Sequence, residues 1–262
     1  MERPTGYRHN RCYANGDSNC STKISKEHFI SANLLRRIQL NDTAKIAGLA
    51  WQEREKFDIV PIKSLASNIL CKRHNEALNP LDAVVGSFAD TIKRFDRREP
   101  ARNDMAHFSG SDIERWMLKC LLGLTASGNL RSGLKPECID LLFQRREWSE
   151  DWGMYFSMDA SRQIYHTDSL LIETRTTPDH KLILACHFYV QGLPFILVLG
   201  KPGNPASFGV WRPKEIRFEQ PACKNFVSLS WNGNRCGEAV TLKRVGTYNG
   251  PPPTWEEWEK QA

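Results

Sequence analysis

Two pairs of potential metal ligands lie in the first third of the chain. Cys12 and Cys20 enclose an Asn-Gly turn, and two residues separate Cys71 from His74. That second spacing lets a chain that turns into a helix direct both side chains at one ion, and tetrahedral Cys3His sites commonly hold zinc. Cys12 and Cys20 are farther apart than is usual, but the turn can fold them together. The pairs predict a structural zinc, the alternative being buried thiols beside an unrelated histidine.

The expected role of the other cysteines depends on the cellular compartment, and we expect a cytoplasmic protein. No apolar run is as long as a membrane span, and the sequence Met-Glu-Arg-Pro at the start lacks the pattern of a secretory signal. In a reducing compartment, clustered cysteines predict metal binding and scattered ones predict small core residues. The scattered cysteines are Cys120, Cys138, Cys186, Cys223 and Cys236.

Composition excludes a disordered chain and permits a polyanionic partner. Hydrophobic residues make up 40% of the 262 residues and charged residues 25%, and the formal net charge is +6. Residues 1 to 40 carry seven Lys or Arg against three Asp or Glu, and residues 91 to 102 carry five against two. Both basic stretches flank the Cys/His pairs, where phosphate-neutralising charge would be useful.

One segment with polar residues follows the first Cys pair, and another surrounds the second pair. One segment reads Ser25-Lys26-Glu27-His28-Phe29-Ile30, and the other runs from Ser67-Asn68 to Cys71-Lys72-Arg73-His74-Asn75. This order resembles the zinc-containing HNH nucleases. In that family a Cys pair precedes an acidic-His dipeptide, an Asn lies shortly before a second Cys pair, and a metal-binding His or Asn follows directly. The resemblance covers residues 12 to 75, with the next helix to about residue 95 as its outer limit.

The resemblance implies a role for each matching residue. His28 would be the general base, and its near-neutral unperturbed pKa suits it to taking a proton from water. Glu27 and Asn75 would hold a catalytic Mg²⁺ or Mn²⁺, which polarises the scissile phosphate. Asn68 would orient His28 or its loop. The nearby cations that could neutralise phosphates are Lys23, Lys26, Lys72 and Arg73.

Several positions depart from the family pattern. Ser31 stands where proline is frequent, the acidic residue is Glu, and His74 replaces the last Cys. His28 and Asn68 are forty positions apart, and we assign the surplus to a helix from Leu34 to about Lys56. In a competing register His74 is the catalytic metal ligand and no complete zinc site remains.

Each implied role also has a structural alternative. His28 could be a satisfied structural histidine, and the two asparagines, Asn68 and Asn75, could serve as turn or cap residues. The nearby lysines and arginines could be solvated surface residues.

Apolar periodicity predicts three helices in the middle of the chain. The first begins at Asn79-Pro80 and buries Leu81, Val84, Val85, Phe88, Ile92 and Phe95. A second begins with a capping box of Ser111 and Glu114 and ends at Gly128. Its stripe of Trp116, Met117, Cys120, Leu121 and Leu124 predicts core packing. A third, shorter helix follows Pro136.

From about Trp152 the sequence favours β-strands. The β-branched or aromatic runs cover residues 152–158, 170–176, 182–190, 193–199, 208–218, 226–231 and 240–245. Gln191-Gly192 is typical of a hairpin turn. We expect a mostly antiparallel sheet, followed by a tail with Trp255 and Trp258 after Gly250.

Together these patterns predict an α+β protein in three units. Residues 1–98 would form a zinc-stabilised ββα-metal (HNH) module, residues 99–150 a helical connector, and residues 151–262 the antiparallel β domain. The expected function is metal-dependent hydrolysis of phosphodiester bonds by an endonuclease, with DNA as the substrate because the family mostly cuts DNA. One alternative is a zinc-stabilised module that binds nucleic acid or protein without catalysis, and another is an interaction protein that acts through its β half. No membrane partner is expected.

Overall fold

The structure, a computed structural model, describes residues 4–38, 42–53, 56–96, 104–157, 169–200, 204–220, 223–233 and 236–243. Its α-helices are α1 (Ala32–Ile38), α2 (Lys72–Asp96), α3 (Gly110–Ala126) and α4 (Glu137–Leu142). The strands of the first half are β1 (Ile24–His28), β2 (Thr43–Ala47), β3 (Asp58–Pro61), β4 (Ala66–Cys71) and β5 (Asp104–Ser109). Those of the second half are β6 (Gly153–Phe156), β7 (Ser169–Thr176), β8 (Ile183–Val190), β9 (Leu193–Val198), β10 (Val210–Trp211), β11 (Pro213–Gln220), β12 (Cys223–Ser230) and β13 (Gly237–Lys243). Within the described ranges, no helix combines the length and the apolar character needed to cross a bilayer.

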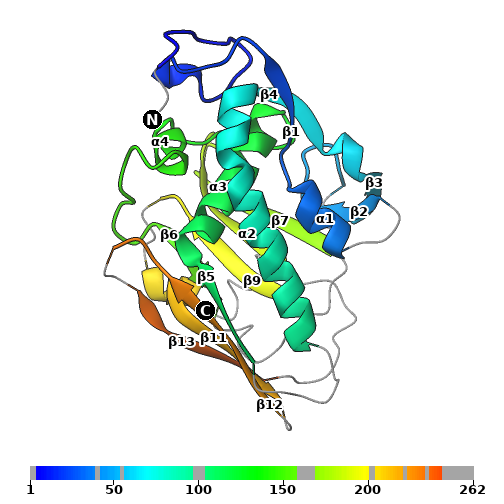
Figure 1. Cartoon of the computed structure of the whole chain (residues 1–262), viewed down its shortest axis with the longest axis vertical. Coiled ribbons are helices and arrows are strands. Elements are labelled where there is room, and N and C mark those ends of the chain that lie inside the picture. Colours follow the sequence, from blue (N-terminus) through cyan, green and yellow to red (C-terminus); the bar gives the residue numbers. More distant parts are fainter. Residues whose placement is uncertain are drawn as a thin grey trace.

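A strand pair and a helix near the N-terminus form one local unit. β1 and β4 are antiparallel neighbours, with Ile24 opposite Cys71 and His28 opposite Ala66. The register shifts between Ser25 and Glu27. α2 begins at the residue after β4, so β1, β4 and α2 form two strands and a helix, with α1, β2 and β3 inserted in the chain between β1 and β4 (Figure 1). This ββα arrangement positions the residues that the sequence singled out.

The predicted helix between Leu34 and Lys56 is wrong beyond Ile38. The chain instead forms the short helix α1 and then β2, which pairs with β3 on one side and with β7 on the other. Strand pairing buries Ala44 and Ile46, a gain that outweighs local helix propensity. β2 stops at Gly48, where a Cβ atom would lie 1.8 Å from the carbonyl oxygen of Ile172.

The start of α2 also differs from the prediction. The helix begins at Lys72, and Pro80 lies inside it. A proline inside a helix removes one backbone hydrogen bond, but α2 has a long apolar face against the core that stabilises it as a whole. That face is buried as expected at Leu81, Val85, Phe88, Ile92 and Phe95.

α3 is the central helix, and its cap differs from the predicted one. Ser109 Oγ accepts the backbone N–H of Asp112 at 3.1 Å, so Ser109 is the N-cap. Ser111 instead accepts the backbone N–H of Asn232, and the buried Glu114 forms a two-bond ion pair with Arg212. The predicted capping box is therefore wrong. The predicted apolar stripe is buried, and the helix ends two residues before Gly128, which has a φ of 76°.

The other strands form two larger sheets. One has the order β10-β6-β9-β8-β7-β2-β3 and the other the order β13-β11-β12-β5. Most neighbouring strands are antiparallel, as expected, with parallel pairs at β2–β7, β11–β13 and β5–β12. Gln191 and Gly192 both have positive φ between β8 and β9, which confirms the predicted hairpin turn.

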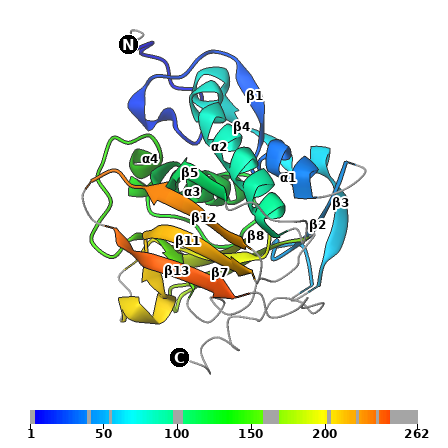
Figure 2. The same cartoon turned by 60° about the horizontal axis from the view of Figure 1, so that its bottom comes forward.

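The three predicted units contribute strands to the same sheets and residues to the same hydrophobic core. β2 joins the sheet that contains β7, and β5 joins the sheet that contains β12. α3 contacts α2, β9 and β12 (Figure 2). One contiguous hydrophobic core extends from Cys12 to Leu242. The predicted boundaries at 98 and 150 do not separate independent sheets or cores. The predicted tail with Trp255 and Trp258 lies outside the described residues.

Candidate functional site

The four predicted zinc ligands meet at one point. His74 Nδ1 lies 3.3 Å from the sulfur of Cys12, 3.8 Å from that of Cys20 and 3.3 Å from that of Cys71. All four side chains are buried, and their ligand atoms lie within 4.8 Å of one another. Tetrahedral zinc with ordinary Zn–S and Zn–N bonds separates sulfur and nitrogen ligands by about 3.6 Å. The cluster therefore has the donor set and spacing to hold a zinc ion.

The fold brings these ligands together from two loops and two elements. The 3-10 turn η1 (Asn15–Asp17) reverses the chain between Cys12 and Cys20, as the Asn-Gly dipeptide predicted. Cys71 is the last residue of β4 and His74 lies in the first turn of α2. Cys71 is also the end of the β1–β4 ladder. A metal here would fix the N-terminal loop to the ββα unit.

Asp17 supports the histidine ligand from behind. Its Oδ2 atom lies 3.1 Å from His74 Nε2 and 2.5 Å from Arg145 Nη1. Burial opposes ionisation, but the N–H of Asn19 and the nearby His74 and Arg145 keep the pKa of Asp17 below its usual value. Asp17 was not singled out from the sequence, although it lies between the first two cysteines.

The thiols differ in their readiness to ionise. Burial raises the pKa of Cys12 to about 12 and raises that of Cys20. Burial would also raise the pKa of Cys71, but backbone N–H donors at His74 and Ser21 lower it below its ordinary value. Cys71 therefore ionises more readily than Cys12 and Cys20, and the thiolate is the form that binds a metal.

Glu27 is engaged in a buried ion pair with Lys119 of α3. Lys119 Nζ lies 2.7 Å from Glu27 Oε1 and 2.7 Å from Asp82 Oδ2 of α2. Glu27 is 4% exposed and Lys119 is 1% exposed. Burial would lower the pKa of Lys119, but the two carboxylates raise it above its ordinary value. An ammonium group thus neutralises the carboxylate that was predicted to hold the catalytic metal.

Asp82 and Lys119 were not recognised from the sequence. Asp82 follows Asn75 by seven residues, about two helical turns, so the two share one face of α2. That spacing is a signal that could have found Asp82. Lys119 lies within an apolar helical stripe, where nothing in the sequence distinguishes it from a surface lysine.

His28 is half-buried at the end of β1. Burial lowers its pKa, and the charges of Arg36 and Lys26 lower it further, while Asp82 opposes them. The imidazole is therefore neutral, and able to accept a proton, at a lower pH than an ordinary histidine.

The two asparagines lie in different environments. The amide of Asn75 donates to Ser25 Oγ at 2.8 Å, across the contact between α2 and β1. Asn68 is exposed on β4 and faces a cavity. Its predicted role of orienting His28 is not supported by a hydrogen bond between them in the described part of the chain.

The three residues predicted to surround a catalytic metal thus have separate contacts. Glu27 binds Lys119, Asn75 binds Ser25, and His28 is near Asp82. Among the described His, Cys, Asp and Glu side chains, the Cys3His cluster is the only group of three or more placed to share an ion. A catalytic ion held by Glu27 would therefore have to displace the Lys119 ammonium from the carboxylate.

Three of the four predicted phosphate-binding cations are exposed. Lys23, Lys26 and Lys72 lie at the surface of the ββα unit, and Arg73 is partly buried. The backbone N–H of Lys72 donates to the carbonyl of Lys23, which places these two residues side by side. Lys72 Nζ also lies 3.6 Å from Glu76.

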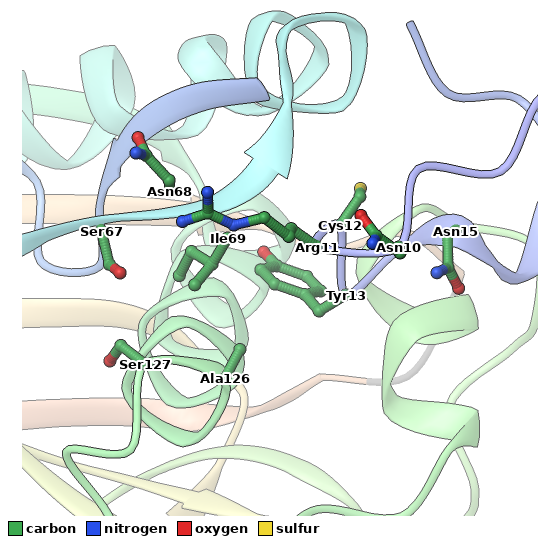
Figure 3. Close-up of a pocket in the computed structure, with 10 residues that line it drawn as sticks. All are labelled: Asn10, Arg11, Cys12, Tyr13, Asn15, Ser67, Asn68, Ile69, Ala126 and Ser127. Atoms are coloured by element: carbon green, nitrogen blue, oxygen red, sulfur yellow. The ribbon is translucent and has the colours of Figure 1, made fainter. Parts of the chain in front are cut away.

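A cavity of about 560 Å³ lies next to the metal cluster and β4. Figure 3 shows the side chains of Arg11 and Asn68 on one side of it, Tyr13 and Ile69 within it, and Ser127 at the far side. Burial, together with the nearby Glu27 carboxylate, raises the pKa of Tyr13 well above its ordinary value. Tyr13 therefore connects the wall of the cavity with the buried polar cluster around Glu27.

Comparison with protein-family models, with curated proteins and with solved structures finds no match to this chain.

Proposed function

We propose that the β1–β4–α2 unit is the catalytic module of an HNH-type, metal-dependent endonuclease that hydrolyses phosphodiester bonds, with DNA as its substrate. One observation carries the proposal. The antiparallel β1–β4 pair continues without a break into α2, and a zinc-type Cys3His cluster closes the end where they join. This geometry agrees with the order of motifs that the sequence shares with the HNH family.

His28 is the proposed general base. It lies at the end of β1, half-buried, and no residue in the described ranges forms a hydrogen bond to its ring. Its lowered pKa keeps the imidazole neutral at physiological pH, which is the form that accepts a proton from water. The exposed Lys23, Lys26 and Lys72 would neutralise phosphates on either side of the bond that is cut.

The catalytic ion would be Mg²⁺ or Mn²⁺. A bound ion would supply charge stabilisation at the phosphate. Glu27 can take part only after it releases Lys119, because the ammonium occupies its oxygen at 2.7 Å.

The test compares three purified proteins on supercoiled plasmid DNA with Mg²⁺ or Mn²⁺. Wild type should cut, and His28→Ala should be slower by a factor of about 10² to 10⁴, the usual contribution of a general base. His107→Ala is the matched control, because His107 is exposed on β5 in the other sheet and should not affect cutting. Equal cutting by wild type and His28→Ala would overturn the role of His28.

A second function is favoured by the Glu27–Lys119–Asp82 contact. A buried ammonium between two carboxylates is a structural arrangement, and it suits a zinc-stabilised nucleic-acid-binding module without catalysis. In that case DNA would bind wild type and His28→Ala equally, and neither protein would cut with any divalent ion. A mobility-shift assay beside the plasmid assay separates the two functions.

A further inference from the structure

The cavity beside β4 has the composition of an anion-binding site. Its volume of about 560 Å³ lies in the range of about 300–1,000 Å³ that is typical of small-molecule sites. The lining contains one cation, Arg11, together with asparagine amides and serine hydroxyls, and no carboxylate. A lining of this kind favours a ligand with negative charge and several hydrogen-bonding groups.

Two polar side chains of the lining are available to a ligand. Arg11 and Asn68 are exposed, and the guanidinium and the amide have no ion pair or hydrogen bond with any residue that the structure describes. The Tyr13 hydroxyl is buried and has no hydrogen-bond partner in the same described ranges. This hydroxyl faces the interior around Glu27, so only the ring of Tyr13 can contact a ligand in the cavity.

The cavity also offers an apolar wall. Tyr13 and Ile69 lie next to each other, since the Tyr13 N–H donates to the Ile69 carbonyl at 3.0 Å. Figure 3 shows the Tyr13 ring and the Ile69 side chain between Arg11 and Ser127. An aromatic ring close to a guanidinium group is the combination on which unpaired bases stack.

The position of the cavity relates it to the proposed catalytic base. Ala66 is the register partner of His28, Ser67 is the partner of Glu27, and the cavity begins at Ser67. Asn68 is two residues from Ala66, about 7 Å along the strand. A nucleic-acid strand rises about 3.4 Å per stacked nucleotide, so the cavity lies within about two nucleotides of a phosphate that faces His28.

We infer that this cavity binds one unpaired nucleotide of a DNA strand, next to the phosphodiester bond that faces His28. Arg11 contacts the phosphate of this nucleotide, Asn68 hydrogen-bonds the edge of its base, and the base lies against Tyr13. The inference rests on the proposed nucleic-acid function and adds to it a preference for unpaired DNA. It also gives Asn68 a binding role in place of the predicted one.

The test measures binding without cleavage. A fluorescein-labelled oligodeoxynucleotide of 12 nucleotides, in single-stranded or duplex form, is titrated with the zinc-loaded protein in buffer without Mg²⁺ or Mn²⁺, and anisotropy gives Kd. Arg11→Ala should raise Kd for the single strand about tenfold and reduce the slope of log K against log salt by about 0.7, the value for one phosphate contact. Asn68→Ala should raise Kd about threefold or more with the slope unchanged, because it removes no charge.

Lys63→Ala is the matched control. Lys63 is an exposed cation in the turn η2 (Ile62–Ser64), outside the cavity, and its loss should change Kd less than twofold. Zinc content equal to that of wild type shows that each variant is folded around the metal cluster. Equal effects of Arg11→Ala and Lys63→Ala would overturn the assignment, as would tighter binding of the duplex with the same dependence on Arg11.

The binding assay for the cavity and the cleavage assay for the nuclease can fail independently of each other. Binding that depends on Arg11, together with no cutting by wild type, would leave the cavity assignment intact and overturn the nuclease. Cutting that depends on His28, together with binding that does not change in Arg11→Ala and Asn68→Ala, would overturn the cavity assignment and leave the nuclease intact.

Discussion

The Nε2 atom of His74 lies 3.1 Å from Asp17 Oδ2, while Nδ1 of the same ring faces the three thiols. A carboxylate in this position fixes the ring orientation and the tautomer of a metal-binding histidine. Arg145 in turn holds Asp17 from the α4 side. The relationship supports His74 as a member of the zinc cluster and gives it a testable partner.

Replacing Asp17 should weaken zinc binding. Asp17→Asn keeps the shape of the side chain but removes its charge, and the loss of such a supporting carboxylate typically costs about 10–100-fold in metal affinity. Competition with a chromophoric chelator measures this. Asp140→Asn is the control, because Asp140 also binds Arg145, whereas the carboxylate on His74 is that of Asp17. Equal affinities of Asp17→Asn and wild type would contradict the role of Asp17.

Metal removal should destabilise the whole chain. The N-terminal loop and the ββα unit share one hydrophobic core with the sheets, and the cluster joins the loop to this core. We expect about one zinc per chain by elemental analysis, and a lower thermal midpoint after chelation or in Cys71→Ser. The exposed Cys236 provides the control Cys236→Ser. Purified protein without zinc, and with an unchanged midpoint in Cys71→Ser, would remove the structural metal.

Replacing Lys119 should allow a metal ion to bind in the place that its ammonium group occupies. Lys119→Met leaves the buried Glu27 and the partly buried Asp82 without their common counter-ion, and the loss of one partner of a buried pair costs about 3–5 kcal/mol. Mn²⁺ should bind between the two carboxylates and raise the thermal midpoint of this variant. Wild type and the exposed-site control Lys63→Met should show no such rise in a thermal-shift titration. A variant that does not respond to Mn²⁺ would show that Glu27 and Asp82 cannot form a metal site.

His187 should make stability depend on pH. It is buried in β8 and stacked against Tyr189, and burial lowers its pKa from 6.5 to about 3. Below pH 6.5 the unfolded chain therefore binds a proton that the folded chain does not, so stability falls as the pH falls. The loss between pH 7 and pH 5 should be roughly 2 kcal/mol from this residue.

Urea unfolding at the two pH values measures that loss. His187→Phe keeps an aromatic ring without a titrating group, so its change in unfolding free energy between pH 7 and pH 5 should be smaller by this amount. Identical changes for wild type and His187→Phe would show that the histidine is not buried in its neutral form.

Local chemistry in the sequence was sufficient for several features. Cys71 and His74 are close in sequence, and the Asn15-Gly16 turn brings Cys12 and Cys20 together, so short-range geometry predicts the zinc cluster. The strands of the second half and the Gln191-Gly192 turn were also predicted, because alternation and turn propensity are local properties.

The remaining features depend on contacts between residues far apart in the chain. Residues 43–47 form a strand and not the predicted helix because β7, more than a hundred residues away, pairs with them. Glu27 lies against Lys119 because α3 packs across the ββα unit. The sequence by itself determined which residues could bind a metal or accept a proton. Only the tertiary structure decided which charge each of them meets, because the partner of a buried carboxylate is set by packing between elements and not by spacing along the chain.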